Sequence, residues 1–91
     1  MTHTVRQATV DDVEQLVPLF DAYRQFYGRT SDAAAARAFL LARCANREST
    51  LFIAHEGDTA IGFAQLYPSF SSVSLARIFI LNDLFVQEQA R

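Results

Sequence analysis

The sequence is short of the residues from which metal and nucleotide sites are usually built. Among its 91 residues are one cysteine, two histidines and three glycines. The single thiol, Cys44, excludes an internal disulfide and a thiolate-bound metal cluster within one chain. His3 and His55 have no carboxylates at ligand spacing beside them. The glycines form no phosphate-binding loop, and there is no Gly-x-Ser-x-Gly motif for a serine hydrolase. We therefore expect no metal site.

Positive charge and long apolar runs are scarce as well. All eight basic residues are arginines scattered along the chain, and the formal net charge is -2 with a pI near 5.5. This pattern argues against a nucleic-acid partner, which requires a basic patch or stripe. No apolar run approaches about 18 residues, and the N-terminus lacks the apolar core of a signal peptide. The sequence therefore predicts a cytoplasmic protein with no membrane partner.

The most apolar stretch of the chain is Ala76–Val86. With 51% hydrophobic residues the chain suits one globular domain over residues 1–91. Both alternating sets of Ala76–Val86 are apolar, which is typical of a strand covered on both faces, so we expect a central strand. Asn82 and Asp83 interrupt it. They fit either a strand end or bulge without function, or a polar pair that faces a cleft, since bulges are common beside active sites.

Two helices are signalled by capping residues. Thr9 and Asp12 resemble a capping box, with Asp in place of Glu, before a helix whose apolar stripe runs to about residue 27. Pro18 within this pattern predicts a kink or two shorter helical pieces. Gly28 is suited to end the helix. Ser31 is expected to cap a second, alanine-rich helix that reaches about residue 46.

The remaining residues predict strands. A short strand is expected over Thr4–Ala8, and a hairpin over Leu51–His55 and Ala60–Tyr67. Gly62 inside the returning strand predicts a bulge or the close approach of another backbone, and Pro68 is expected to end that strand. The order β-α-α-β-β-β gives an α+β fold with a mainly antiparallel sheet. Two helices of this length can cover only one face of such a sheet.

Aromatic residues gather at two places where elements end. One group contains Tyr23, Phe26 and Tyr27, and the other contains Tyr67 and Phe70. Such groups favour core and rim packing, with the wall of a substrate pocket as the alternative.

Taken in order, several short segments resemble a known enzyme family. They are Arg6-Gln7-Ala8-Thr9 with Asp11-Asp12, the hairpin Phe52–Ala54 and Ala60–Phe63, and Leu84-Phe85-Val86 followed by Arg91. This ordered set resembles the N-terminal part of the GNAT (GCN5-related) N-acetyltransferases over the whole length of the chain. The resemblance implies a GNAT-like N-terminal half that stops before the family's pyrophosphate-binding loop.

The resemblance also implies roles for particular residues. Acetyl-CoA would be the cosubstrate, with its pantetheine arm on the main chain of Leu84, Phe85 and Val86 and with Arg91 at the start of the pyrophosphate loop. Asp83 would be the catalytic base or the anchor for the amine. The acceptor side would then be lined by Asn82, Tyr23, Tyr27, Tyr67 and Phe70.

Two functions of different classes follow. The first is an N-acetyltransferase, or its N-terminal portion, which moves acetyl from acetyl-CoA to a primary amine on a small molecule or peptide. The alternative is a non-catalytic small α+β module that associates with itself through an open strand edge. In both cases a long apolar strand with an open edge predicts a homodimer.

Overall fold

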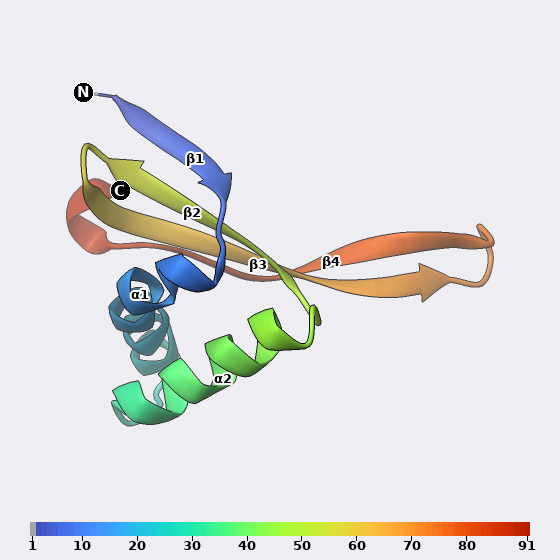
Figure 1. Ribbon diagram of the computed structural model, residues 1–91, viewed down its shortest axis with the longest axis horizontal. Coiled ribbons are helices and arrows are strands. Elements are labelled where there is room, and N and C mark those ends of the chain that lie inside the picture. The colour runs from blue at the N-terminus through green and yellow to red at the C-terminus, as the bar shows by residue number, and fades with distance from the viewer. Residues whose placement is uncertain (1) are drawn as a thin grey trace.

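The computed structural model describes residues 2–91 as a four-stranded antiparallel sheet with two helices against one face (Figure 1). The strands lie in the order β1-β2-β3-β4, so the predicted α+β fold and its β-α-α-β-β-β order are confirmed. Neither helix in the described residues is long and apolar enough to cross a bilayer. The elements are β1 (His3–Gln7), α1 (Val13–Phe26), α2 (Ala33–Ala45), β2 (Thr50–Glu56), β3 (Thr59–Ser71) and β4 (Ala76–Val86).

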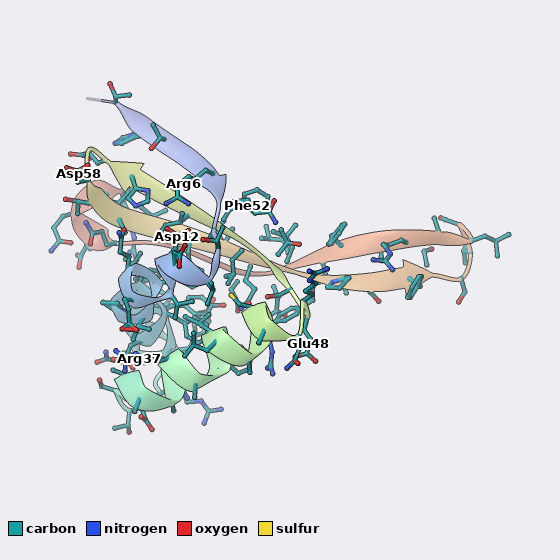
Figure 2. The ribbon with its side chains drawn as sticks, in the orientation of Figure 1. Arg6, Asp12, Arg37, Glu48, Phe52 and Asp58 are labelled. Carbon is teal, nitrogen blue, oxygen red and sulfur yellow. The ribbon has the colours of Figure 1, made fainter. Side chains whose placement is uncertain are left out.

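The first helix begins at a polar cluster that joins it to β1. The Thr9 amide donates to the Asp12 carboxylate at 2.8 Å, which confirms the predicted capping interaction. Both terminal nitrogens of Arg6 donate to the same carboxylate, at 2.8 and 2.6 Å (Figure 2). The Arg6 guanidinium, helped by the Thr9 amide, holds the pKa of Asp12 well below its usual range. This buried charge is therefore paired at the point where the chain turns from strand to helix.

Helix α1 runs without a break through Pro18, so of the two predicted outcomes, a kink or two shorter helical pieces, the second is wrong. Proline removes only the bond to the Glu14 carbonyl, and both residues lie on the exposed side of the helix, where water can reach that carbonyl. Gly28 ends the helix as predicted, at a φ of 86°. Its amide donates to the Gln25 carbonyl at 2.9 Å, and the Arg29 amide donates to the Arg24 carbonyl at 3.0 Å.

The N-cap of α2 is Asp32 and not Ser31 as predicted. The Asp32 carboxylate accepts from the Ala35 amide at 3.0 Å. The Ser31 hydroxyl is already engaged, because it donates to the Asp21 carboxylate at 2.6 Å. Asp21 thus ties the loop between the helices to α1, and the cap falls to the next residue.

The core lies between the two helices and the middle strands. Its buried side chains come from α1, α2, β2 and β3, and the opposite face of the sheet has no covering layer among the described residues. Phe52 points to that bare face (Figure 2). The core residues are Val13, Leu16, Val17, Leu19, Phe20, Ala36, Leu40, Leu51, Ile53 and Phe63.

Strand β4 has the predicted bounds, but it is an edge strand and not a central one. Of its residues only Asp83 is buried, whereas Phe79 and Leu81 are 53% and 56% exposed. The prediction was wrong because apolar residues on both faces of a strand indicate a covering layer on each face. Within residues 2–91, no strand lies beyond β4 and no helix covers its outer part around Phe79 and Leu81.

Strand β3 continues to Ser71, so Pro68 does not end it as predicted. Beyond Leu66, which pairs with Thr50 at the start of β2, β3 has a neighbour on one side only. A proline, which lacks the amide hydrogen, is tolerated at such an edge. The outer parts of β3 and β4 therefore form a two-stranded arm, residues 67–80, that projects beyond the helices (Figure 1).

Replacement of Gly62 by Ala is expected to lower the free energy of unfolding by about 1–3 kcal/mol. A Cβ at Gly62 would lie 2.8 Å from the carbonyl oxygen of Phe85, so β3 and β4 would have to separate. This confirms the predicted close approach, and a register shift next to Ala54 accompanies it. Urea unfolding measures the change. Gly57→Asn is the control, because Gly57 has open space around it and a φ of 60° that Asn accepts; an equal loss in both variants would contradict the explanation.

Candidate functional site

The site is organised by a bulge in β4. Gln65 pairs with Asp83 and Leu66 with Leu81, so Asn82 is an extra residue in β4 with no partner on β3. This is the bulge that the polar pair predicted. Because side chains alternate along a strand, the extra residue shifts the alternation and places Asp83 on the helix side of the sheet. Asp83 is only 7% exposed there.

A network of neutral hydrogen-bond donors holds the Asp83 carboxylate. The Tyr23 hydroxyl donates to Oδ1 at 2.9 Å, the Asn82 amide donates to Oδ1 at 3.0 Å, and the Gln65 amide donates to Oδ2 at 2.8 Å. Gln65 is fully buried, and its own Oε1 accepts from the Ser49 hydroxyl at 2.7 Å. Because a carboxylate only accepts, Asp83 fixes which end of the Gln65 amide faces it, and the Ser49 hydroxyl donates to the other end.

The network leaves Asp83 able to accept further hydrogen bonds. A carboxylate offers about four acceptor positions, two on each oxygen. Three are occupied, two on Oδ1 and one on Oδ2. No cation lies among these partners, so the negative charge of Asp83 is solvated by dipoles and not neutralised. An N–H group of a bound molecule that reaches Oδ2 would therefore meet both a charge and a free acceptor position.

Asp83 lies in an open cleft of about 430 Å³ between the helices and the sheet. We call it the Asp83 cleft. Its walls are mostly aromatic and small apolar side chains, with Asn82 and Asp83 on the strand side and Arg24 on the helix side. Such a mixture, in which a few polar groups stand in an apolar surround, is typical of small-molecule sites. The residues around it are Phe20, Tyr23, Arg24, Ala35, Ala36, Phe39, Tyr67, Asn82 and Asp83.

A second cleft, of about 300 Å³, lies along the end of β4. We call it the β4 cleft. Tyr23 lines both clefts, so the two adjoin at this residue, and its hydroxyl donates to Asp83. The Arg91 side chain folds back here, and its Nε donates to the Val86 carbonyl at 2.6 Å. The residues around the β4 cleft are Tyr23, Phe26, Tyr27, Leu84, Phe85, Val86 and Arg91.

The structure brings most of the predicted site residues into these two groups. Asn82, Asp83, Tyr23 and Tyr67 meet in the Asp83 cleft, and Leu84, Phe85, Val86, Arg91 and Tyr27 meet in the β4 cleft. Tyr27 therefore lies beside the residues expected to bind acetyl-CoA and not with those expected to bind the acceptor. Phe70 is in neither cleft: it pairs with Arg77 in the arm and is 72% exposed.

The sequence analysis missed the polar support behind Asp83 and part of the cleft wall. Gln65 follows Phe63 at the spacing of two that defines one face of a strand, so its inward direction was readable as a polar residue at a core position. Ser49 carried no signal, because it lies just before β2 and meets Gln65 only in the fold. The rings of Phe20 and Phe39 stack with 5.7 Å between their centres. The sequence pattern indicates only that both residues are apolar positions on their helices.

The Tyr23 hydroxyl is expected to ionise late, with a pKa of about 12. Burial is the largest cause, followed by the hydrogen bond to Asp83 and the negative charge of that carboxylate. The pKa of tyrosine in an unfolded chain is near 10, so protonated Tyr23 stabilises the folded state relative to the unfolded one. This stabilisation is complete below about pH 10 and is lost as the pH rises toward 12. Tyrosinate absorbance measures it. The latest transition should vanish in Tyr23→Phe and persist in Tyr27→Phe.

Two curated bacterial proteins are similar in sequence. The uncharacterized N-acetyltransferase YhfO of Bacillus subtilis is 55% identical over 87 residues, which are 96% of this chain and 58% of that protein. A probable acetyltransferase of Haemophilus influenzae is 46% identical over 81 residues, which are 88% of this chain and 56% of that protein. No protein-family model matches the sequence. The chain thus spans somewhat more than half the length of these relatives.

Solved structures share the fold. A crystal structure of a probable acetyltransferase superposes with a TM-score of 0.90 at 46% identity, over 97% of this chain and 60% of that one. In sequence and fold, the chain is thus similar to somewhat more than half of proteins named as an N-acetyltransferase or as probable acetyltransferases. A GCN5-related N-acetyltransferase of Ralstonia eutropha, 22% identical, gives a TM-score of 0.73 over 99% of this chain and 65% of that one.

The GNAT fold also appears with a ligand. A predicted acetyltransferase of Clostridium acetobutylicum, whose crystal structure was solved with acetyl-CoA, gives a TM-score of 0.77 over 99% of this chain and 63% of that one. At 15% identity the likeness concerns the fold alone.

Within residues 2–91 no group of three or more His, Cys, Asp or Glu side chains is placed to hold a metal ion.

Proposed function

We propose that this chain carries the amine-binding part, and the β4 contacts to acetyl-CoA, of an N-acetyltransferase that acts on a primary amine. One observation carries the proposal: the bulge at Asn82 places a dipole-solvated carboxylate, Asp83, in an aromatic cleft that shares Tyr23 with the β4 cleft. A cation can therefore be held within reach of a second, neighbouring groove. That is the arrangement needed to bring an amine to a thioester.

The chemistry is the attack of an amine on a thioester. The bound ammonium first loses one proton to solvent, and the neutral amine nitrogen then forms a bond to the acetyl carbon while the bond from that carbon to sulfur breaks. The electron pair of the broken bond leaves with sulfur, and the second proton lost by the nitrogen neutralises this thiolate, so the products are an amide and the thiol of CoA. Asp83 attracts the ammonium form to the cleft and accepts an N–H bond at Oδ2, and Asn82 adds polar contact beside it. Tyr23, with its pKa near 12, stays protonated at neutral pH and acts as a fixed donor where the two clefts adjoin. Positioning then supplies most of the rate.

In the β4 cleft, the end of β4 is suited to an amide-bearing chain such as pantetheine. Because β4 is the edge strand, alternate main-chain amides and carbonyls of residues 84–86 point away from β3 and have no strand partner there. Leu84, Phe85 and Val86 would bind such a chain as a neighbouring strand does. Arg91 would meet the negatively charged part of the cosubstrate once it leaves the Val86 carbonyl.

Acetyl-CoA is expected to bind the 91-residue chain weakly, with a Kd of about 1 mM. The β4 cleft is small, and Arg91 is its only charged residue, so a few main-chain bonds must supply most of the affinity. Titration followed by amide NMR should move the signals of residues 84–86. Desulfo-CoA, which keeps the pantetheine amides, should move the same signals, whereas acetate should move none. Micromolar affinity, or shifts confined to other elements, would contradict this expectation.

A second candidate function is that of a non-catalytic module that associates with itself. The observation in its favour is the arm, where both strands have an open edge and where Phe79 and Leu81 on β4 are half exposed. The two candidates differ in the Asp83 cleft. A module would bind neither acetyl-CoA nor primary amines there, and NMR titration with both decides between them.

A further inference from the structure

The Asp83 cleft carries a second charge, of opposite sign, which the proposed reaction does not use. Arg24 stands in the last turn of α1 and lines the cleft from the helix side, while Asp83 lines it from β4. Phe20, Phe39 and Tyr67 supply apolar wall. A molecule in this cleft therefore meets a negative group at the sheet, a positive group at the helix and apolar surface beside them.

The Arg24 guanidinium is not paired within the described residues: no hydrogen bond or salt bridge there engages its side chain. The carboxylate one turn earlier on α1, Asp21, would be the natural partner, but other donors occupy it. It accepts from the Ser31 hydroxyl at 2.6 Å, from the Asp32 amide at 2.8 Å and from the Gln25 side chain at 3.1 Å. Asp21 thus ties down the loop between the helices. The Ser31 and Asp32 hydrogen bonds are the main causes that lower the pKa of Asp21, and the charge of Arg24 lowers it further without a direct bond.

Some arginines of the chain are paired, whereas Arg29 and Arg47, like Arg24, have no hydrogen bond or salt bridge from their side chains among the described residues; Arg24 differs from these two in lining the Asp83 cleft. Arg37 binds Glu14 at 2.8 Å, and Arg43 binds Glu48 at 3.1 Å. Arg24 is held in place by its main chain instead, since its carbonyl accepts from the Tyr27 and Arg29 amides that close the end of α1. A fixed backbone with an unpaired guanidinium at the wall of a cleft is suited to bind an anion brought by a ligand.

We infer that the acceptor is a zwitterionic amine: a small molecule whose ammonium binds Asp83 and whose carboxylate, or a similar anionic group, binds Arg24. This rests on the proposed function, because it assigns the Asp83 cleft to the acceptor. It narrows the acceptor to amino carboxylates and related compounds with an apolar spacer. Diamines and longer polyamines are disfavoured, because their second ammonium would approach Arg24 without a partner.

The test compares ligands of matched length on the 91-residue chain. The ligands are ω-amino carboxylates of two to six carbons, the alkylamines of the same length and the corresponding diamines, each titrated into labelled protein and followed by amide NMR. We expect the best amino carboxylate to bind about tenfold more tightly than its alkylamine, and the diamine to bind most weakly. Signals from both α1 and β4 should move with the amino carboxylate.

Two arginine variants test the role of the guanidinium. Arg24→Gln should reduce the preference for the amino carboxylate over the alkylamine to within twofold. Arg29→Gln, which removes the same charge from an exposed residue outside the cleft, should keep it. NMR spectra of both variants establish that they are folded. Equal binding of the three ligand classes by the unaltered chain, or a preference that survives Arg24→Gln, would overturn the inference.

The experiment also separates this inference from the proposed function. If alkylamines and amino carboxylates bind equally well, and Asp83→Asn abolishes the binding of both, the amine site stands and the zwitterionic acceptor is refuted. If no amine binds in an Asp83-dependent way, the amine site is refuted and the inference falls with it. A tenfold preference that needs both Asp83 and Arg24 supports both.

Discussion

On the proposed function, replacement of Asp83 by Asn in a complete enzyme that contains this chain is expected to lower the rate of acetyl transfer about 100-fold and to change the affinity for acetyl-CoA less than twofold. The change removes the only carboxylate of the Asp83 cleft, and with it the attraction for an ammonium group. It leaves the β4 cleft intact, because no residue of that cleft depends on the Asp83 side chain except Tyr23. The rate should therefore fall on the amine side of the reaction alone.

Asn is nearly the same size as Asp, so the variant also tests the network behind the site. The Asn oxygen can still accept from Tyr23, but its amide would face the Gln65 amide, and two donors cannot bond each other. Gln65 must then turn over, and the Ser49 hydroxyl must change from donor to acceptor. Both changes are possible without an unpaired buried group, so we expect the variant to fold.

Steady-state rates at several pH values, with calorimetry for acetyl-CoA, measure these effects. Asp58→Asn is the matched control, because it removes the same charge from an exposed turn (Figure 2). It should leave the rate unchanged. If Asp83→Asn also keeps its rate across the pH range, Asp83 has only a structural role: it would merely fill the hydrogen-bond requirement of Gln65 and Tyr23.

The order of elements could be predicted because the signals for it are local. The interaction of Thr9 with Asp12, the glycine at position 28 and the hairpin over Leu51–His55 and Ala60–Tyr67 each depend on nearby residues, and the structure contains all three. The errors arose where a distant residue decided the outcome. Ser31 is not the cap of α2, because Asp21 from the preceding helix occupies its hydroxyl. Strand β3 continues through Pro68 because β2 begins opposite Leu66, so Pro68 has no strand neighbour on that side.

The candidate site could be predicted only in part, for the same reason. The polar pair in an apolar strand pointed to Asn82 and Asp83, and the structure does form a bulge there. Nothing local indicated that Gln65 would lie opposite Asp83, since strand register is a property of the assembled sheet. The apolar pattern of β4 predicts a covering layer on each face of the strand. Residues 2–91 do not provide these layers, and most of β4 is exposed. Burial on both faces was therefore the wrong expectation.

The second large effect that we expect is self-association through β4. Between Arg77 and Asp83 this strand has no charged residue and no proline, so nothing along that stretch blocks pairing with another strand. Phe79 and Leu81 expose about half of their surface. Two copies of one edge can pair antiparallel about a two-fold axis, which is the symmetry of most homodimers. Burial of these side chains in both copies would supply several kcal/mol, at roughly 25 cal/mol per Å² of apolar surface.

We therefore expect the 91-residue chain to form dimers, or to be poorly soluble, at concentrations of about 0.1 mM and above. Phe79→Lys, which places a charge on the open strand, should raise the dissociation constant of the dimer at least about tenfold. Val73→Lys adds the same charge at the arm's tip, where the side chain is 97% exposed and off the strand, and it should leave association unchanged. Light scattering and sedimentation measure both variants. A soluble monomer of the unaltered chain at about 1 mM would contradict this prediction. The exposed apolar side chains and the unpaired main-chain groups of β4 would then not be sufficient to drive association.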